Sequence, residues 1–381
     1  MKYDFDEPIE RLGTGCVKWD EMQGTDSIPL WVADMDFKAA PAILKAVRER
    51  AEHGVFGYTV VDDSYYDAII SWFERRHHWT IRREEILYTT GVVPAMSVAV
   101  KALTMPGEQV LILSPDYNCF FSSIRNNGCE PLECVLRFCR NTRFEVDWED
   151  FEAKCADEKT TLFLLCNPHN PTGRVWTRDE LQQMADICRR HHVTIVSDEI
   201  HCELVMPGNT FCPMATVEPD TVTLNSPSKS FNIAGLQIAN IICRRPDWRR
   251  RLDRAININE VCDVNPFGPV ALKAAYNESG DWIDELNLYL WDSYNALCDF
   301  AAQHLPQWQV RPLEGTYLPW VDITATGMKA QQYADLLMEK AGVRVNPGTM
   351  YGAQSGEGYI RLNIACRRSL LMEALQRIAS L

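Results

Sequence analysis

A lysine stands between two serines in the stretch SPSKSFNIAGLQ (226–237), just ahead of an apolar run. Lysine is rarely buried, because its charge strongly disfavours an apolar setting. A lysine that is partly desolvated, or close to other cations, has a lowered pKa, and its neutral amine attacks carbonyl groups. Lys229 is therefore a candidate nucleophile, and it suggests an aldehyde cofactor held as a Schiff base.

Pyridoxal phosphate is such a cofactor, and it needs a lysine, an acid at its ring nitrogen and a cradle for its phosphate. Asp198 ends the apolar run VTIVSD and could pair with the ring nitrogen. The stretch TTGVVPAMS contains a helix start, whose free N–H groups and dipole attract phosphate. Hydroxyls near the lysine could add to this cradle. The candidate phosphate ligands are Gly91, Val92, Val93, Ser226 and Ser228.

Each of these signals is common without any cofactor. An isolated SxSK is usually a surface lysine, and an aspartate after a strand is more often a helix cap. A helix start of the GVVP type is more often structural than phosphate-binding. The prediction of a site therefore rests on the combination, and on elements that bring these residues to one place.

Short apolar runs alternate with amphipathic helices from about residue 85 onward. This alternation predicts an α/β fold, with a mostly parallel sheet covered by helices on both faces. Ligands of such sheets sit beyond the carboxyl ends of the strands, where the polar residues of interest fall. A helix is predicted from Thr177, which would form a capping box with Glu180. The predicted strands are 85–90, 109–114, 161–167, 193–199, 221–226 and 237–243.

The pattern changes after about residue 280. Helices there alternate with short strands that look antiparallel, in WQVRPLEGTYLPWVDI (308–323) and GYIRLNIAC (358–366). We predict a large cofactor-binding domain over residues 46–280 and a smaller α/β domain over residues 281–381. The N-terminal segment, residues 1–45, is predicted to join the smaller domain.

The composition excludes some classes of partner. The chain has 381 residues and a formal net charge of −14, whereas a nucleic-acid surface needs a basic patch. The densest basic run, RRPDWRRRLDR (244–254), is better explained as the solvated face of a helix. No apolar run approaches the roughly 20 residues of a membrane span, and the polar N-terminus is unlike a signal peptide. We expect a cytoplasmic protein that binds a small anionic or zwitterionic molecule.

The cysteines and histidines give little support to a metal site. Fourteen cysteines are scattered along the chain without a CxxC pair, so we expect reduced thiols. His191 and His192, with His201 and Cys202 further along, are the alternative ligands. The first two close a predicted helix, where histidine suits the negative end of the dipole. We predict no metal.

Several motifs carry a resemblance over nearly the whole chain. Four stretches resemble the successive motifs of fold-type I pyridoxal-phosphate enzymes, the aspartate aminotransferase superfamily. They are CNPHNPTG (166–173), SDEIH (197–201), SPSKSFNIAGLQ and YIRLNIA (359–365). Three further stretches resemble one branch of this superfamily, the cystathionine β-lyase or C–S lyase branch, often called MalY/PatB-like. They are PLWVADMDF (29–37), FGYT (56–59) and PDYNCFF (115–121). Of these, WVADMDF is the most specific to the branch.

The resemblance implies a role for each matching residue. Lys229 would carry the cofactor, and Asp198 would bind its pyridine nitrogen. Asn170 would hydrogen-bond the phenolic oxygen of the cofactor. His201 stands where aminotransferases usually have a tyrosine that reaches the same oxygen. Tyr117 would stack on the cofactor ring.

Two further roles concern the substrate and a second subunit. Arg361 would clamp the α-carboxylate of the substrate with two parallel hydrogen bonds. Tyr58 would lie at the substrate site of the neighbouring subunit and contact the phosphate of its cofactor, which implies a homodimer with shared sites. One position departs from the aminotransferases: Gln237 stands where many of them carry a phosphate-binding arginine, and this weakens an aminotransferase assignment.

The resemblance thus implies a lyase that eliminates a thiol from cystathionine or a related cysteine thioether and leaves pyruvate and ammonia. Lys229 would remove the α-proton as the general base. Two alternatives stay open. An aminotransferase would use the same residues. A cofactor-binding transcription regulator without enzymatic activity would carry a DNA-binding domain ahead of the fold, whereas the family motifs here begin by Trp31.

Overall fold

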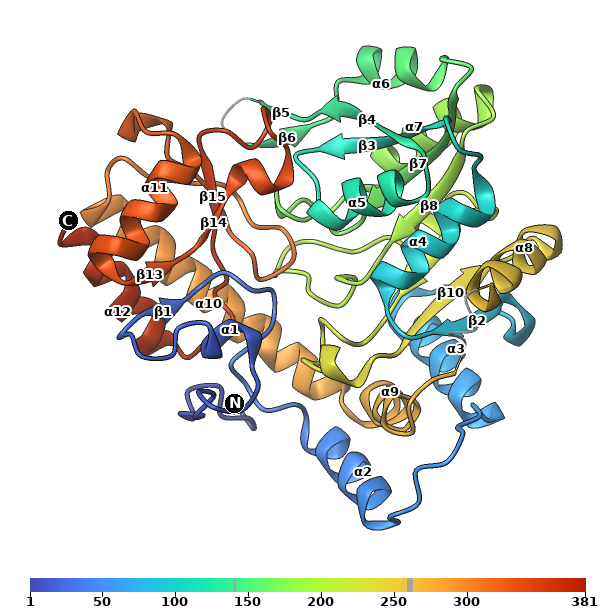
Figure 1. Cartoon of the computed structure of the whole chain (residues 1–381), viewed down its shortest axis with the longest axis horizontal. Coiled ribbons are helices and arrows are strands. Elements are labelled where there is room, and N and C mark those ends of the chain that lie inside the picture. The colour runs from blue at the N-terminus through green and yellow to red at the C-terminus, as the bar shows by residue number, and fades with distance from the viewer. Residues whose placement is uncertain (140–141, 259–262) are drawn as a thin grey trace.

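The computed structural model describes residues 1–139, 142–258 and 263–381, and its centre is a sheet of seven strands (Figure 1). All six predicted strands belong to it, within one or two residues of the predicted bounds. The seventh strand was not predicted and lies at one edge. In spatial order the strands are β2 (Ile86–Thr89), β10 (Ala239–Cys243), β9 (Val222–Asn225), β8 (Thr194–Asp198), β7 (Thr160–Cys166), β3 (Gln109–Ser114) and β4 (Glu130–Val135).

The sheet is mostly parallel, as the alternating pattern predicts. Strand β10 runs antiparallel to both of its neighbours, β2 and β9. The pairs that join β9, β8, β7, β3 and β4 are all parallel. Six strands therefore point the same way, and their carboxyl ends meet at one edge of the sheet. This edge gathers the loops that begin after Thr89, Ser114, Cys166, Asp198 and Asn225.

Helices cover both faces of the sheet, and the strand residues alternate between them. Val110 and Ile112 of β3 belong to the core under α4 (Val92–Leu103), α5 (Asn118–Asn126) and α8 (Pro246–Asn257). Leu111 and Leu113 belong to the opposite core, under α6 (Trp148–Cys155) and α7 (Arg178–Arg190). Successive side chains of a strand point to opposite faces, so a strand buried on both faces is apolar throughout. This is why the strands could be recognised as short continuous apolar runs.

Two helix starts follow directly from the sequence. Helix α7 begins after Thr177, whose hydroxyl accepts a hydrogen bond from the Glu180 N–H while the Glu180 carboxylate accepts from the Thr177 N–H. This is the predicted capping box. Helix α8 opens with Pro246 at its first position and carries residues 246–254 of the basic run, as expected for a solvated helix.

The C-terminal part of the chain forms a second, smaller sheet. It is antiparallel, in the order β11 (Gln309–Val310), β12 (Trp320–Asp322), β15 (Tyr359–Arg361) and β14 (Asn346–Pro347). The helices of this part are α10 (Gly280–His304), α11 (Ala330–Leu336) and α12 (Arg368–Ala379). Strands β11, β12 and β15 fall in the two stretches that were predicted to hold short antiparallel strands, whereas β14 was not predicted.

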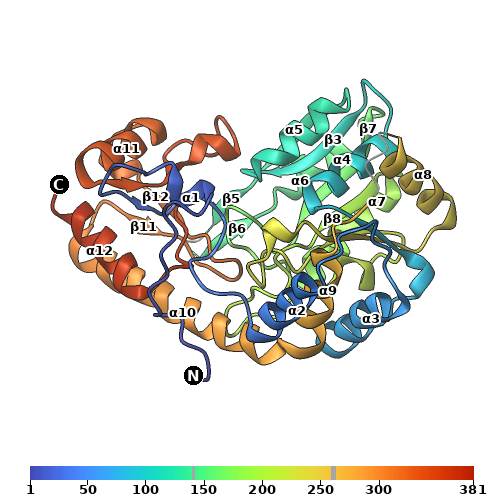
Figure 2. The ribbon, with the colours of Figure 1, turned by 60° about the horizontal axis from the view of Figure 1, so that its bottom comes forward.

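The N-terminal segment lies beside this C-terminal part in both views (Figures 1 and 2). Strand β1 (Ile28–Pro29) pairs in parallel with β13 (Val343–Arg344). Lys2 forms an ion pair with Asp281 in the first turn of α10. These contacts are what the predicted joining of residues 1–45 to residues 281–381 requires, but the division into domains stays a prediction.

The remaining helices complete the molecule around the sheet. Helices α2 (Pro41–Glu52), α3 (Asp63–His77) and α9 (Phe267–Glu278) pack together, and α1 (Val17–Asp20) is a single turn. A two-stranded ribbon is formed by β5 (Arg137–Cys139) and β6 (Arg143–Glu145). Within the described ranges, no helix is long and apolar enough to span a membrane.

Candidate active site

A cavity of about 410 Å³ opens at the carboxyl edge of the large sheet. Segments far apart in the sequence form its wall, including the 31–33 segment, the loops after five strands and the end of β15. Of the residues predicted for the site, those that line the cavity are Gly91, Val92, Val93, Tyr117, Asn170, Asp198, His201, Ser228, Lys229 and Arg361. The fold thus brings most of the predicted site to one place.

Lys229 follows β9 by four residues, so its side chain enters the cavity from a strand end. Its Nζ donates a hydrogen bond to the carbonyl oxygen of Ala33 at 2.7 Å. Burial and the nearby charge of Arg361 lower the pKa of the Lys229 amine to about 8, although Asp34 and Asp198 oppose the shift. An amine with this pKa is partly neutral at neutral pH and therefore nucleophilic.

Asp198 is the last residue of β8 and is buried. One oxygen of its carboxylate, Oδ1, accepts a hydrogen bond from the N–H of Ile200 at 3.1 Å. Burial raises its pKa to about 7, against the effects of this hydrogen bond and of the Lys229 charge. A cationic group placed next to Asp198 would favour the carboxylate form.

His201 lies three residues further on and is buried as well. Burial and the charges of Lys229 and Arg361 lower the pKa of its ring to about 3, so the ring is neutral at physiological pH. Its Nδ1 has no hydrogen-bond partner among the described residues. A buried polar atom without a partner destabilises the fold by about 1–3 kcal/mol unless a ligand or water satisfies it.

Arg361 ends β15 of the small sheet and lines the same cavity. Its Nη1 donates to Oδ1 of Asn170 at 3.0 Å, and its Nη2 donates to the carbonyl oxygen of Trp31 at 2.9 Å. The guanidinium also lies 4.7 Å from the ring centroid of Tyr351. Its Nε is buried without a partner in the described part of the chain. Arg361 is therefore fixed in orientation and keeps an unused donor.

Tyr117 and the start of α4 form another part of the wall. Tyr117 precedes α5 as its N-cap residue, and burial raises the pKa of its phenol. Gly91 occupies the N-cap position of α4, and no described side chain caps that helix end. The first N–H groups of α4 are therefore available to donate hydrogen bonds to a phosphate at this edge of the sheet.

Two of the predicted residues lie outside the cavity wall. The hydroxyl of Ser226 donates to the carbonyl oxygen of Ile238 at 2.6 Å and accepts from the N–H of Ser228, so it braces the lysine loop. Tyr58 is 99% exposed and does not line the cavity of its own chain. Its predicted contact needs a second subunit. Gln237 is exposed and takes a left-handed backbone conformation with φ of 51°.

The structure adds residues that the sequence did not assign to the site. Trp31 and Ala33 present main-chain carbonyls to Arg361 and Lys229. Asn346 and Tyr351 also line the cavity, and the side-chain amide of Asn346 donates to the Tyr351 hydroxyl at 2.9 Å and to the carbonyl oxygen of Trp31 at 3.0 Å. The motif WVADMDF was the available signal for the first two. No motif pointed to the other two.

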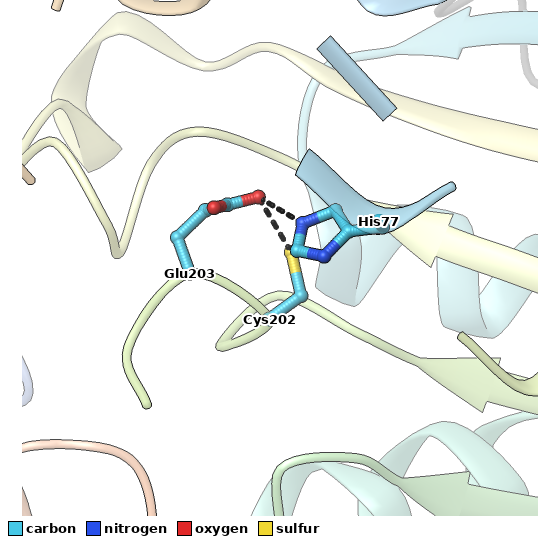
Figure 3. A group of neighbouring side chains, drawn as sticks. All are labelled: His77, Cys202 and Glu203. Atoms are coloured by element: carbon cyan, nitrogen blue, oxygen red, sulfur yellow. Dashed lines mark hydrogen bonds and ion pairs between the residues drawn. The ribbon is translucent and has the colours of Figure 1, made fainter. Parts of the chain in front are cut away.

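A separate cluster, half-buried at His77 and buried at the other two residues, joins α3 to the loop after β8, and its spacing among the described residues would allow it to hold a metal (Figure 3). It consists of His77, Cys202 and Glu203. Its ligand atoms already contact one another: Oε1 of Glu203 lies 2.6 Å from Nε2 of His77 and accepts from Nε1 of Trp72 at 2.7 Å. We interpret it as a hydrogen-bonded carboxylate. Of the alternative ligands considered from the sequence, Cys202 belongs to this cluster, whereas His191 closes α7 and His201 lines the cavity.

The residues present fit pyridoxal phosphate. The cavity combines a lysine of lowered pKa, a carboxylate at a strand end and an uncapped helix N-terminus. Two buried polar atoms, Nδ1 of His201 and Nε of Arg361, have no partner within the described ranges and would gain one from a polar ligand. These groups come from loops that follow different strands, as expected for a site at the edge of an α/β sheet.

Known proteins resemble this chain in sequence and in structure. The cystathionine beta-lyase PatB of Bacillus subtilis is 41% identical over 383 residues, which cover 98% of each chain. The structure of cystalysin from Treponema denticola, which contains pyridoxal 5'-phosphate, superposes with a TM-score of 0.96 at 34% identity over 100% of this chain and 98% of that one.

The PLP-bound C–S lyase from Staphylococcus hominis gives a TM-score of 0.92 at 33% identity, over 99% of this chain and 98% of that one. These likenesses cover 98–100% of the chain. The model of one family, aminotransferase class I and II, matches residues 25–378, and the chain therefore belongs to that family.

Proposed function

We propose that this protein is a pyridoxal-phosphate-dependent C–S lyase, which eliminates a thiol from cystathionine or a related cysteine thioether. The observation that carries the proposal is the placement of Lys229, Asp198 and Arg361 in one cavity. The likeness of nearly the whole chain to PatB, to cystalysin and to the PLP-bound C–S lyase from Staphylococcus hominis supports the same function. The products would be a thiol, pyruvate and ammonia.

The cofactor would be held by residues already described. Lys229 would bind it covalently, Asp198 would face its ring nitrogen, and Tyr117 would cover one face of the ring. Asn170 and His201 would meet its phenolic oxygen. The phosphate would lie at the N-terminus of α4, with Gly91, Val92, Val93 and Ser228 around it, and with Ser226 behind Ser228. When bound, the cofactor supplies an aldehyde for the substrate amine and a ring that accepts the electron pair left at Cα.

Arg361 would bind the substrate α-carboxylate. Its guanidinium is held by Asn170 and Trp31 before any substrate arrives, and this fixed orientation lowers the entropy lost on binding. A planar guanidinium can bind a carboxylate through two parallel hydrogen bonds. Because Arg361 and Lys229 line the same cavity, a bound α-carboxylate would hold the substrate Cα near the lysine.

Lys229 would then act as the general base. Its pKa of about 8 leaves a neutral fraction at physiological pH, and a general base works best with a pKa near the operating pH. The amine takes the proton from Cα and becomes an ammonium. The same ammonium could return a proton within the cavity, which is why an aminotransferase with these residues is the competing outcome in the test below.

We also propose that the protein forms a homodimer with shared sites and works in the cytoplasm. Tyr58 is exposed, and so are its neighbours Val55, Phe56 and Val60. A second copy of the chain would cover these apolar side chains and would receive Tyr58 at its own cavity. Buried thiols such as those of Cys166 and Cys202 take part in hydrogen bonds, which suits a reducing compartment. No nucleic-acid or membrane partner is proposed.

The proposal is tested by mixing purified protein, pyridoxal phosphate and cystathionine, with and without an added keto acid. A lyase gives pyruvate, ammonia and thiol in equal amounts without the keto acid, and the variant Lys229→Ala gives none of them. Turnover that depends on the keto acid and yields a new amino acid without thiol would identify an aminotransferase. Ligand binding without any turnover would favour a regulator.

A further inference from the structure

The 31–37 segment, WVADMDF, is an irregular chain between β1 and α2, and its first three residues line the active-site cavity. Its main-chain carbonyls accept hydrogen bonds from side chains on several elements. Ala33 accepts from Nζ of Lys229 at 2.7 Å and from the hydroxyl of Tyr317 at 3.0 Å. Asn363 donates to the carbonyl of Asp34 at 2.6 Å. An irregular segment with this many partners is held in one conformation.

Behind the segment lies a buried ionic cluster. Lys18 is fully buried, and its Nζ lies 2.9 Å from Oδ2 of Asp36 and 3.8 Å from Oδ1 of Asp34. Arg11 contacts the same two carboxylates, at 2.5 Å for Asp36 and 2.9 Å for Asp34. Nε1 of Trp19 donates to Oδ1 of Asp36 at 2.9 Å. The cluster therefore joins the first 20 residues of the chain to the segment that faces Lys229.

Such a cluster gives little net stability for its charges. Desolvation of buried ions often exceeds their mutual attraction, so an apolar replacement of the whole cluster can be neutral. What the cluster does provide is a fixed position for the chain between Asp34 and Asp36. That position sets where the carbonyl oxygen of Ala33 stands relative to Nζ of Lys229.

We propose that the carbonyl oxygen of Ala33 is the resting acceptor for the Lys229 amine whenever that amine is not bound to the cofactor, and that Lys18, Asp36 and Tyr317 are positioning residues that hold this acceptor. The inference rests on the proposed function, in which a freed Lys229 acts as the base. The Cα–H bond of the substrate breaks, its electron pair is left at Cα for the cofactor ring to accept, and the proton forms the third N–H bond of the ammonium. One N–H of this ammonium then donates to Ala33.

The segment acts on Lys229 in two ways. The Ala33 carbonyl accepts a hydrogen bond, and the Asp34 carboxylate contributes a negative charge; both favour the ammonium form. The other groups that face the amine are Arg361, which opposes the ammonium, and Asp198 and Cys119, which favour it. If the segment shifts, the ammonium loses two of its supports, and the pKa of Lys229 falls further.

The test uses the double variant Lys18→Met with Asp36→Asn, which removes both buried charges together. The matched control is Glu7→Gln, which breaks the exposed ion pair between Glu7 and Lys38 just beyond the segment. In the full-length chain without cofactor, the rate at which cyanate modifies Lys229 is followed against pH by mass spectrometry. The cofactor-loaded variants are then compared in kcat and KM.

We expect the midpoint of the cyanate reaction in the double variant to move below that of the wild type. The rate at pH 7 should rise by about 2-fold to 10-fold, the equilibrium equivalent of one hydrogen bond. The kcat of the loaded variant should fall by about 10-fold to 100-fold, because the base is misplaced, while KM changes by less than about threefold. Glu7→Gln should match the wild type in both measurements.

An unchanged midpoint together with an unchanged kcat, in a folded double variant, would overturn the inference. If the double variant does not fold, Tyr317→Phe decides, because it removes one donor to Ala33 and no charge; an unchanged kcat there would overturn the inference as well. If the wild type releases no thiol from any cysteine thioether, the proposed function fails. The cyanate midpoint still tests the role of the segment in that case.

Discussion

The charge of Lys229 is set by opposing neighbours. Burial and Arg361 favour the neutral amine, and Asp34 and Asp198 favour the ammonium, with a pKa of about 8 as the balance. The ammonium cannot attack an aldehyde, so the rate of cofactor incorporation into the cofactor-free chain should rise as pH rises through about 8 and then level off. The appearance of the visible absorbance of the bound cofactor measures this rate. A midpoint near 10.5, the ordinary lysine value, would show that the amine is solvated.

Asp198 carries a second residue-level prediction. The substitution Asp198→Asn replaces a carboxylate at the strand end with a neutral group of the same shape. A neutral partner cannot hold a proton on the ring nitrogen, so we expect α-proton removal to slow by about 100-fold to 1,000-fold. Exchange of the substrate α-hydrogen with deuterated water, followed by NMR, measures this step. Near-normal exchange in a folded, cofactor-loaded variant would remove Asp198 from the mechanism.

Arg361 carries the third prediction, which separates charge from geometry. Arg361→Lys keeps the cation but loses the planar pair of donors and the contacts with Asn170 and Trp31. We expect kcat/KM to fall by about 10-fold to 150-fold, the equivalent of one charged hydrogen bond, mostly through a higher KM. Steady-state kinetics with a cysteine thioether measure it. A fall in kcat alone would place Arg361 outside substrate binding.

The site could be predicted from the sequence where its groups are side chains in recognisable motifs. Lys229, Asp198 and Asn170 follow apolar strands directly, so their meeting at one sheet edge follows from the fold class. The carbonyls of Trp31 and Ala33 could not be predicted in the same way. A main-chain carbonyl has no residue type to mark it. The carbonyl of Ala33 meets Lys229 across 196 residues of sequence, and the carbonyl of Trp31 meets Arg361 across 330, so only the folded chain brings them together.

At the scale of elements, the buried strands of the large sheet were the easiest to predict. They are apolar on both faces and are bounded by turns and helices, so a short run of letters marks each of them. The antiparallel direction of β10 could not be predicted, because an apolar run has the same pattern in either direction. Strand β4 was missed because it lies at the edge of the sheet and carries Glu130 and Glu133 among its residues.

The loop after β14 supports a prediction at this scale. It carries Met350 and Tyr351 of the cavity wall and packs tightly at Gly348, where an added Cβ would lie 2.7 Å from the carbonyl oxygen of Tyr359 and would also overlap Gly356. Backbone atoms cannot move aside cheaply, so Gly348→Ala should lower the free energy of unfolding by about 1–3 kcal/mol. Urea unfolding of the loaded protein measures it.

Gly235 provides the matched control for this prediction. It lies in the turn of 3-10 helix from Ala234 to Leu236, near the cavity, and an added Cβ there would meet no atom within 4 Å. Gly235→Ala should therefore change the free energy of unfolding by less than about 0.5 kcal/mol. Equal stability of the two variants would mean that the loop after β14 can relax around a methyl group.

At the scale of the whole molecule, the exposed stretch between α2 and α3 stands out. Val55, Phe56, Tyr58 and Val60 are exposed within six residues of one another. A cluster of this kind on a protein surface usually marks an interaction site. The sequence predicts a role for this stretch in a dimer only because FGYT resembles a motif of the C–S lyase branch. The exposure of these side chains could not be predicted, because it depends on how the chain is folded.

The shared-site dimer yields the last prediction. Lys229→Ala and a substitution of Tyr58 should each inactivate the protein, because every site needs Lys229 from one chain and Tyr58 from the other. In an equal mixture that exchanges subunits freely, half of the dimers are hybrids, and one site of each hybrid has both residues. Activity should therefore return to about a quarter of the wild-type level.

Release of thiol from a cysteine thioether measures this recovery, and mass spectrometry of differently tagged chains measures how many hybrids form. Each variant taken alone through the same exchange is the control, and neither should regain activity. Two outcomes would contradict the prediction. If tagged hybrids form and remain inactive, Tyr58 serves the site of its own chain or none. If the Tyr58 variant alone is fully active, the exposed stretch serves association without contributing a side chain to catalysis.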